Sequence, residues 1–422
     1  MIGELCARFE ISARLRDAAL QAQRRVDDVT YDAQRQVSAN VLYAFAQEGI
    51  AESDLHGSTG YGYDDAARAA YESLLARIFG AERALARLSI VSGTHAIVTA
   101  LAACTPPGST LLSISGRPYD TLRNALCDAP HALAREGVTY REIPLRDDGE
   151  VDVPAVLEAV AVAKDCTIFV QRSRGYAPRR SLTVDQCART FAAVKSAAAN
   201  APILVDNCYG ELVEPQEPTH VGADLVMGSL IKNLGGAIAP AGGYIAGRGD
   251  LVERVAARAY APGLGASLGP TLGFGRALVQ GLFFAPLVVE QCLRGLDFAA
   301  ALFEQLGYRV DPSPGQPRTD IVQAIALESP ERLLRFARGL QQAMPINARF
   351  RPQPGPVPGY AQPVVMSSGA FVAGATIELS CDAPLRPPYE VYLQGGVTYA
   401  HACLGALLAA RSLEDAAGSV KG

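Results

Sequence analysis

The sequence of 422 residues lacks the cysteine, histidine and glycine spacings that are typical of disulfide-rich, metal-binding and nicotinamide-binding proteins. Its nine cysteines are scattered without a CxxC pair, and its five histidines have no HxxxH spacing. We therefore expect neither a disulfide framework nor a metal site, and this cysteine usage is typical of a reducing cytoplasm. No GxGxxG segment follows a strand pattern and opens a helix, so a nicotinamide cofactor is disfavoured.

The chain also has little that indicates contact with nucleic acid or with a membrane. Its formal net charge is −5, so no basic surface is predicted. The first 28 residues are charged throughout and lack the apolar region of a secretory signal. The longest weakly polar stretches, 90–104 and 281–289, are too short for a membrane span or contain proline. We expect a cytoplasmic protein that binds neither nucleic acid nor membrane.

Short apolar runs that alternate with helical patterns make up most of the chain up to about residue 287. The runs predicted as strands are 88–91, 110–114, 139–143, 167–171, 203–206, 225–227 and 243–246. They are continuously apolar, which favours a mostly parallel sheet with helices on both faces, of the α/β class. We predict a helical segment over 1–55, a large domain over 56–287 and a small α+β domain over 288–422.

A polar segment stands where one of these apolar runs meets a helical pattern. Ser92, Gly93 and Thr94 lie at this junction. Glycine permits close approach of the backbone, and the start of a helix offers free N–H groups, so the segment suits a phosphate. The alternative is an ordinary turn in which Ser92 or Thr94 caps the helix.

Two further polar residues follow later strands of the same predicted sheet. Asp206 ends the apolar run 203–205, which places a carboxylate at the carboxyl edge of the sheet. Lys232 follows the run 225–227, and Ser229 between them could reach the same phosphate. The alternatives are a carboxylate that caps a turn and a lysine whose ammonium extends to water.

The order of these three segments is more informative than any one of them. A phosphate loop, then an acid at a strand end, then a lysine about one βα unit later is what pyridoxal 5′-phosphate (PLP) requires at one sheet edge. The sequence therefore predicts a PLP enzyme. In it Lys232 carries the cofactor as a Schiff base, and Asp206 pairs with the ring nitrogen.

At this point the sequence resembles a known family over nearly its whole length. It is similar to fold-type I PLP-dependent enzymes, and within them to the methionine gamma-lyase family and its group of aluminium-resistance proteins. The stretches that carry the resemblance are 57–65, 90–97, 171–176, 205–211, 228–233, 239–247 and 386–396. The resemblance implies a seven-stranded PLP domain, a smaller carboxy-terminal domain, and a homodimer or homotetramer with active sites at the subunit interface.

The resemblance also implies roles for further residues. Ser92, Gly93, Thr94 and Ser229 match the phosphate cup. Tyr61 or Tyr63 is the nearest match to a tyrosine that reaches the phosphate from the neighbouring subunit, with Arg68 a weaker match to its arginine partner. Tyr119 is the expected aromatic against the PLP ring, and its hydroxyl could assist a leaving group.

The substrate carboxylate requires a cation, most simply an arginine that binds it with two hydrogen bonds. Related lyases carry this arginine in an Arg-Leu-Ser context, where the present chain has Glu378. We therefore expect Arg386, or Arg174 and Arg172, to bind the carboxylate instead. The alternative for Arg172 and Arg174 is a structural ion pair.

These residues predict an amino-acid lyase that acts through a carbanion. The predicted reaction is γ-elimination on a methionine- or homocysteine-like or other γ-substituted amino acid, with Lys232 as the base. Alternatives are β-elimination, γ-replacement or a specialised biosynthetic step on the same carbanion. An alternative of another class is a catalytically silent PLP-binding regulatory protein, which the presence of both Asp206 and Lys232 disfavours.

Overall fold

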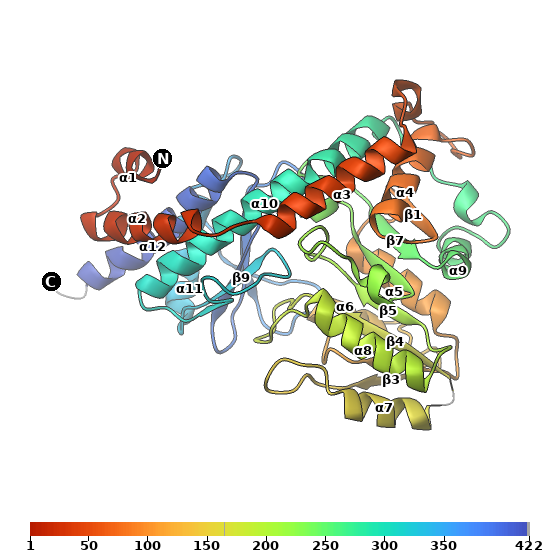
Figure 1. The fold of residues 1–422 in the computed structure, drawn as a ribbon. Helices are drawn as coiled ribbons and strands as arrows, with labels where there is room; N and C mark the ends of the chain where they lie inside the picture. Colours follow the sequence, from red (N-terminus) through yellow and green to blue (C-terminus); the bar gives the residue numbers. More distant parts are fainter. Residues whose placement is uncertain (164, 420–422) are drawn as a thin grey trace. The chain divides into compact units, whose positions relative to one another are not determined.

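The computed structural model describes residues 1–163 and 165–419, which divide into two compact units (Figure 1). One unit is Ala33–Pro286, and the other combines Met1–Asp32 with the chain from Leu287 onward. The first carries all the predicted cofactor residues, so it is described in more detail.

The unit Ala33–Pro286 is built on a seven-stranded sheet in the order β1-β7-β6-β5-β4-β2-β3. Its strands are β1 (Arg83–Arg87), β2 (Thr110–Ser113), β3 (Thr139–Glu142), β4 (Cys166–Gln171), β5 (Ile203–Asp206), β6 (Leu225–Ser229) and β7 (Gly243–Gly247). Strands β3, β2, β4, β5 and β6 are parallel, and β7 runs antiparallel to β6 and β1. The predicted α/β class with a mostly parallel seven-stranded sheet is confirmed.

The first predicted strand was placed wrongly. Residues 88–91 form a turn, and β1 lies before it at Arg83–Arg87, paired with β7. Its charged ends concealed the strand. The Arg87 side chain is nevertheless buried because it forms an ion pair with Glu72 and donates a 2.9 Å hydrogen bond to the Leu268 carbonyl.

Seven helices lie in the described residues of this part of the chain. They are α3 (Asp32–Glu48), α4 (Ala66–Ile78), α5 (Gly93–Cys104), α6 (Asp120–Arg123), α7 (Val153–Val162), α8 (Val184–Ala197) and α9 (Gly249–Ala259). Short helical turns lie at Glu52–Leu55, Asn124–Asp128, Pro218–Val221, Asn233–Gly235 and Gly265–Ser267. Apolar side chains of α5 and α9, such as Ile97 and Val255, are buried in one cluster with strand side chains such as Phe169 and Met227. Helices α7 and α8 lie side by side near β3 and β4 (Figure 1). This burial, worth roughly 25 cal/mol per Å² of apolar surface, fixes the strand ends that carry the candidate site.

The other unit contains a six-stranded sheet whose pairs are all antiparallel, in the order β10-β11-β12-β13-β9-β8. Its strands are β8 (Val310–Asp311), β9 (Val322–Ala326), β10 (Pro354–Gly355), β11 (Val364–Ser368), β12 (Ser380–Pro384) and β13 (Glu390–Gln394). Its helices are α1 (Ile2–Arg8), α2 (Ala13–Asp27), α11 (Pro330–Gln341) and α12 (Tyr399–Ser419). The expected smaller α+β part is confirmed.

One long helix contains an internal proline. Helix α10 (Gly275–Gln305) continues through Pro286, beside the domain boundary predicted between residues 287 and 288. An internal proline removes one hydrogen bond and costs about 3 kcal/mol, which the apolar side chains of the helix offset. By length and composition α10 could span a membrane, but 56% of its most apolar window is buried within the protein.

Candidate active site

The carboxyl ends of β5 and β6 bring Asp206 and Lys232 to one edge of the sheet. The two strands are parallel neighbours, with Asp206 level with Met227. Asp206 is the last residue of β5, and Lys232 follows the end of β6 by three residues. The charge of Lys232 acts on the Asp206 carboxylate, so the two side chains belong to one electrostatic site.

Asp206 is a buried carboxylate with 4% of its surface exposed. Its Oδ1 accepts a 3.1 Å hydrogen bond from the Cys208 backbone N–H. Burial raises the pKa of Asp206 to about 6, while the Cys208 hydrogen bonds and the charges of Lys232 and Arg179 act in the opposite direction. A cationic group beside Asp206 would lower the pKa of its carboxyl group again and so favour the ionised carboxylate.

Lys232 lies against an aromatic ring that the sequence analysis did not single out. Its Nζ is 3.7 Å from the centroid of the Tyr209 ring. Burial lowers the pKa of Lys232, but Tyr209, Cys208 and Glu211 outweigh burial, and the net shift is upward. Lys232 is therefore an ammonium at neutral pH, and an activating mechanism must neutralise it before it can act as a base.

The turn after β5 holds Tyr209 in place. Tyr209 has φ +73°, which is uncommon for a residue other than glycine. The Asn233 side-chain amide donates to the Tyr209 carbonyl at 3.0 Å and to the Glu211 carbonyl at 2.8 Å. The only sequence signal for Tyr209 was its place directly after a strand that ends in Asp206.

The predicted phosphate loop lies at the start of α5, beside the ends of β5 and β6. The Ser92 hydroxyl caps α5 by accepting a 3.1 Å hydrogen bond from the His95 N–H. A Cβ added to Gly93 would lie 3.1 Å from Cys208 Sγ and 3.3 Å from Ser229 Cβ. The absence of a side chain at Gly93 thus lets the positive end of α5 approach the turn after β5, as phosphate binding requires.

Tyr119 joins this cluster from the segment after β2. Its hydroxyl lies 2.7 Å from Thr94 Oγ1, and its backbone N–H donates to Gln171 Oε1 at 2.9 Å. Burial, followed by the charge of Asp206, raises the pKa of the Tyr119 phenol well above its usual value. The structure therefore brings Tyr119, Thr94 and Asp206 together, and the Tyr119 phenol keeps its proton at neutral pH.

The three arginines predicted for the substrate carboxylate have different surroundings. Arg172 is 1% exposed and forms an ion pair with Glu214. It also donates to Asn207 Oδ1 at 2.9 Å, to the Gly210 carbonyl at 3.0 Å and to the Leu182 carbonyl at 3.1 Å. These contacts are what we expect if Arg172 forms a structural ion pair, the alternative to binding the substrate carboxylate.

Arg174 is also buried, with 3% of its surface exposed, and its backbone N–H donates to Ser181 Oγ at 2.9 Å. Arg386 belongs to the unit with the antiparallel sheet. In that unit Glu378, which stands where related lyases have arginine, accepts hydrogen bonds from the Phe371 and Val372 N–H groups at 2.9 and 3.1 Å. Carboxylate binding by Arg174 or Arg386 stays a prediction.

Arg179 is a cation near the site that the sequence analysis missed. Its guanidinium donates to the Gln171 carbonyl at 2.8 Å, at the end of β4, and its charge acts on Asp206. It lies five residues after Arg174, just beyond the stretch 171–176 that carries the resemblance.

Tyr61 and Tyr63 lie on the loop before α4. They are 73% and 52% exposed, and their ring centroids are 5.8 Å apart. Arg68 is buried instead and donates to the Gly269 carbonyl at 2.9 Å and the Tyr63 carbonyl at 3.1 Å. Arg68 therefore supports the loop, while the two rings remain accessible to a partner.

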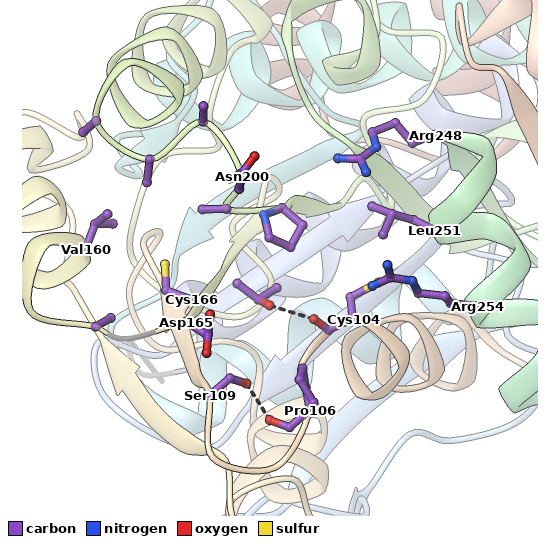
Figure 2. Close-up of a pocket in the computed structure, with 17 residues that line it drawn as sticks. Cys104, Pro106, Ser109, Val160, Asp165, Cys166, Asn200, Arg248, Leu251 and Arg254 are labelled. Atoms are coloured by element: carbon purple, nitrogen blue, oxygen red, sulfur yellow. Dashed lines mark hydrogen bonds between the residues drawn. The ribbon is translucent and has the colours of Figure 1, made fainter.

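A cavity of about 650 Å³ lies at the opposite edge of the same sheet (Figure 2). Ser109, Cys166 and Pro202 line it where β2, β4 and β5 begin, together with Arg248 and Arg254. Ligands of parallel α/β sheets bind at the carboxyl ends of the strands, so this cavity is not the candidate active site. Among the side chains that the structure describes, no cluster of three or more His, Cys, Asp or Glu could hold a metal ion.

The family model of methionine gamma-lyase matches residues 12–414. The uncharacterized protein YnbB of Bacillus subtilis is 42% identical over 365 residues, which cover 86% of each chain. Two solved structures are similar over 97% of this chain. One, from Clostridium acetobutylicum, is described as a candidate cystathionine beta-lyase involved in aluminum resistance (40% identity, TM-score 0.93, 97% of that chain covered). The other is a carbon-sulfur lyase involved in aluminum resistance from Clostridium novyi (36%, 0.92, 98%).

A more distant likeness concerns the fold. The pyridoxal-5′-phosphate-dependent protein YhfS of Escherichia coli is 18% identical, with a TM-score of 0.59 over 93% of this chain and 98% of that one. Together with the sheet order, it confirms the predicted fold type I.

Proposed function

Because this chain belongs to the methionine gamma-lyase family, we propose that it is a PLP-dependent carbon–sulfur lyase that acts on an amino acid. The observation that carries the proposal is the convergence of Lys232, Asp206 and the start of α5 at one edge of the sheet. A regulatory protein that only binds PLP would need Lys232 and Asp206 as well, but it would have no use for a proton donor such as the Tyr119 phenol beside them.

The residues present fit PLP. The start of α5 with Gly93 and Ser229 would hold the phosphate, since a side chain at position 93 would meet Cys208 and Ser229. Asp206 is a buried carboxylate that would pair with the ring nitrogen, and Lys232 would hold the aldehyde. When bound, PLP withdraws electrons from the α-carbon of an amino acid.

The chain's own groups then move the protons. The Lys232 amine takes the proton from the α-carbon of the substrate and delivers it again at a later step. Tyr119, held by Thr94, presents its phenol proton to the departing sulfur. Arg174 or Arg386 binds the substrate carboxylate and so orients the α-carbon toward Lys232.

The finer proposal is γ-elimination on a methionine- or homocysteine-like substrate, or on another γ-substituted amino acid. The description of the Clostridium acetobutylicum relative favours β-elimination as a second candidate. The two reactions share the first proton transfer and differ in their product. γ-Elimination yields a four-carbon 2-oxo acid, whereas β-elimination of cystathionine yields a three-carbon one.

We also propose a cytoplasmic homodimer or homotetramer with active sites at the subunit interface. The exposed Tyr61 and Tyr63 support this proposal, because their rings are available to a neighbouring subunit and large apolar rings are disfavoured in water.

The test is an absorption spectrum of the purified protein beside Lys232→Ala. Sulfur-containing and γ-substituted amino acids are added to each, and the 2-oxo acid is identified. We expect a visible band in the wild type that responds to one class of substrate, and neither band nor product in Lys232→Ala.

Wild-type protein that stays colourless after PLP is added would contradict the cofactor assignment. A band that forms but yields no 2-oxo acid with any amino acid would contradict the lyase and favour the regulatory alternative.

A further inference from the structure

A buried carboxylic acid lies behind Lys232 and has no role in the steps above. Glu211 is 0% exposed, in the turn that also carries Tyr209. Its Oε1 accepts a 2.9 Å hydrogen bond from the Tyr244 hydroxyl on β7. Its Oε2 has no hydrogen-bond partner among the described residues. Such a carboxylate is costly to bury, so its presence requires a reason.

The protein is built to hold Glu211 at this place. A Cβ added to Gly228, four residues before Lys232, would lie 2.7 Å from Glu211 Oε1 and 2.9 Å from Tyr244 Oη. Strand β6 therefore leaves space for the Glu211–Tyr244 pair because residue 228 is glycine. Asn233, the residue after Lys232, donates to the Glu211 carbonyl at 2.8 Å.

The turn itself is rigid on its far side. Glu217 accepts hydrogen bonds of 2.8 Å from Asn207 Nδ2 and from the Leu212 N–H. Arg172 donates to Asn207 Oδ1 at 2.9 Å. These contacts hold the turn on both sides of Glu211, whose carboxyl group is buried within it.

The charges of Glu211 and Lys232 act on each other. Glu211 raises the pKa of Lys232, and Lys232 lowers that of Glu211. Burial dominates for Glu211 and raises its pKa to about 8, with Glu217 acting in the same direction and the Tyr244 hydrogen bond opposing it. Glu211 also acts on Tyr71 of α4, whose pKa is raised by burial and then by Glu211, and on Cys208, whose pKa is raised by burial, by Asp206 and by Glu211.

We propose that Glu211 is a positioning residue that controls how firmly Lys232 holds its proton. An ionised Glu211 stabilises the Lys232 ammonium, and a protonated Glu211 withdraws that stabilisation, so that the ammonium gives up its proton more readily. The inference deepens the proposed function, because Lys232 is the base there. Glu211 is one of the groups that, with Tyr209 and Cys208, raise the pKa of Lys232.

The test measures the charge of Lys232 without cofactor or substrate. The chain has four lysines, at 164, 195, 232 and 421, so competitive acetylation by acetic anhydride reads each one separately by mass spectrometry. Lys195, paired with Asp224 at 2.6 Å, is the internal reference. Cofactor-free full-length wild type and Glu211→Gln are compared from pH 7 to 10.

We expect the variant to acetylate Lys232 at the wild-type rate at pH 7, where the protonated Glu211 of the wild type and the amide of the variant are both neutral. As pH rises through about 8 the wild-type carboxyl ionises and holds the ammonium, whereas the amide of the variant stays neutral. The variant should then react about tenfold faster at pH 9 to 10, since one buried charge at this range is worth about one pKa unit.

Two further variants sharpen the test. Tyr244→Phe removes the hydrogen bond to Glu211 but keeps the charge, so the ionisation of Glu211 and the slowing of Lys232 should move to higher pH. Glu253→Gln changes an exposed carboxylate paired with Arg83 and should leave the profile unchanged.

A folded Glu211→Gln whose Lys232 profile matches the wild type from pH 7 to 10 would overturn the inference. If that variant does not fold, an unshifted profile in Tyr244→Phe overturns it. Failure of the proposed function is a separate result, because acetylation of Lys232 needs neither PLP nor lyase activity.

Discussion

Single residues at this site divide into those that carry chemistry and those that hold them. Arg172 illustrates the division, because its residue type and its place after β4 suited a substrate clamp equally well. The structure surrounds its guanidinium with Glu214, Asn207 and backbone carbonyls of the same unit. A side chain with that many protein partners contributes to stability, and a ligand would have to displace them.

We therefore expect Arg172→Met to lower the free energy of unfolding by about 3–5 kcal/mol, because it leaves Glu214 and the buried acceptors without a partner. Urea unfolding at neutral pH measures the change. Arg189→Met is the control: its ion-pair partners Asp185 and Glu150 are exposed, so its loss should leave the stability nearly unchanged. Unchanged stability in Arg172→Met with a raised KM would instead show that Arg172 binds the substrate.

At the scale of elements, the site depends on how closely helix α5 approaches the turn after β5. Gly93 permits that approach, since an added Cβ would lie 3.1 Å from Cys208 Sγ. Ser92 fixes the first turn of α5 by capping it. Gly93 thus determines how closely α5 contacts the turn after β5, whereas Ser92 stabilises the start of the helix.

We predict that Gly93→Ala weakens PLP binding about tenfold or more while the protein still folds, because α5 must shift by a few tenths of an ångström from the phosphate position. Titration of the visible band with PLP measures the affinity, and circular dichroism checks the fold. Gly3→Ala on α1 is the matched control, since nothing lies within 4 Å of its added Cβ. If Gly93→Ala bound PLP with wild-type affinity, the assignment of the start of α5 to the phosphate site would be wrong.

At the scale of the whole molecule, the proposed assembly predicts that each active site contains residues of two chains. If Tyr61 and Tyr63 complete the site of a neighbouring subunit, each active site takes Lys232 from one chain and the two tyrosines from the other. Lys232→Ala and a double Tyr61→Ala, Tyr63→Ala variant should each be inactive.

Unfolded together and refolded as a mixture, the two variants should recover about a quarter of wild-type activity, because half of the dimers are mixed and each has one intact site. Turnover per chain measures the recovery, and native mass gives the assembly. A mixture as inactive as its components would contradict a shared site.

The sequence by itself determined the fold class and the two principal residues. Continuously apolar strands with intervening helices permit few arrangements other than a parallel sheet with helices on both faces, and parallel strands place their carboxyl ends at one edge. Asp206 and Lys232 each follow such a strand, so their meeting followed from the topology. The strand at Arg83–Arg87 was not predictable in this way, because its buried arginine is compensated by Glu72.

Only the tertiary structure decided the roles that depend on contacts between segments distant in sequence. Tyr209, Glu211 and Arg179 lie near Asp206 or Lys232 because of how the turn after β5 and the segment after β4 fold back, and their own spacing carries no such signal. The ion pair and hydrogen bonds of Arg172 likewise became visible only in the folded chain. A repeating pattern in the sequence specifies which face of an element is buried, whereas the electrostatics of a buried group depend on neighbours that only the folded chain supplies.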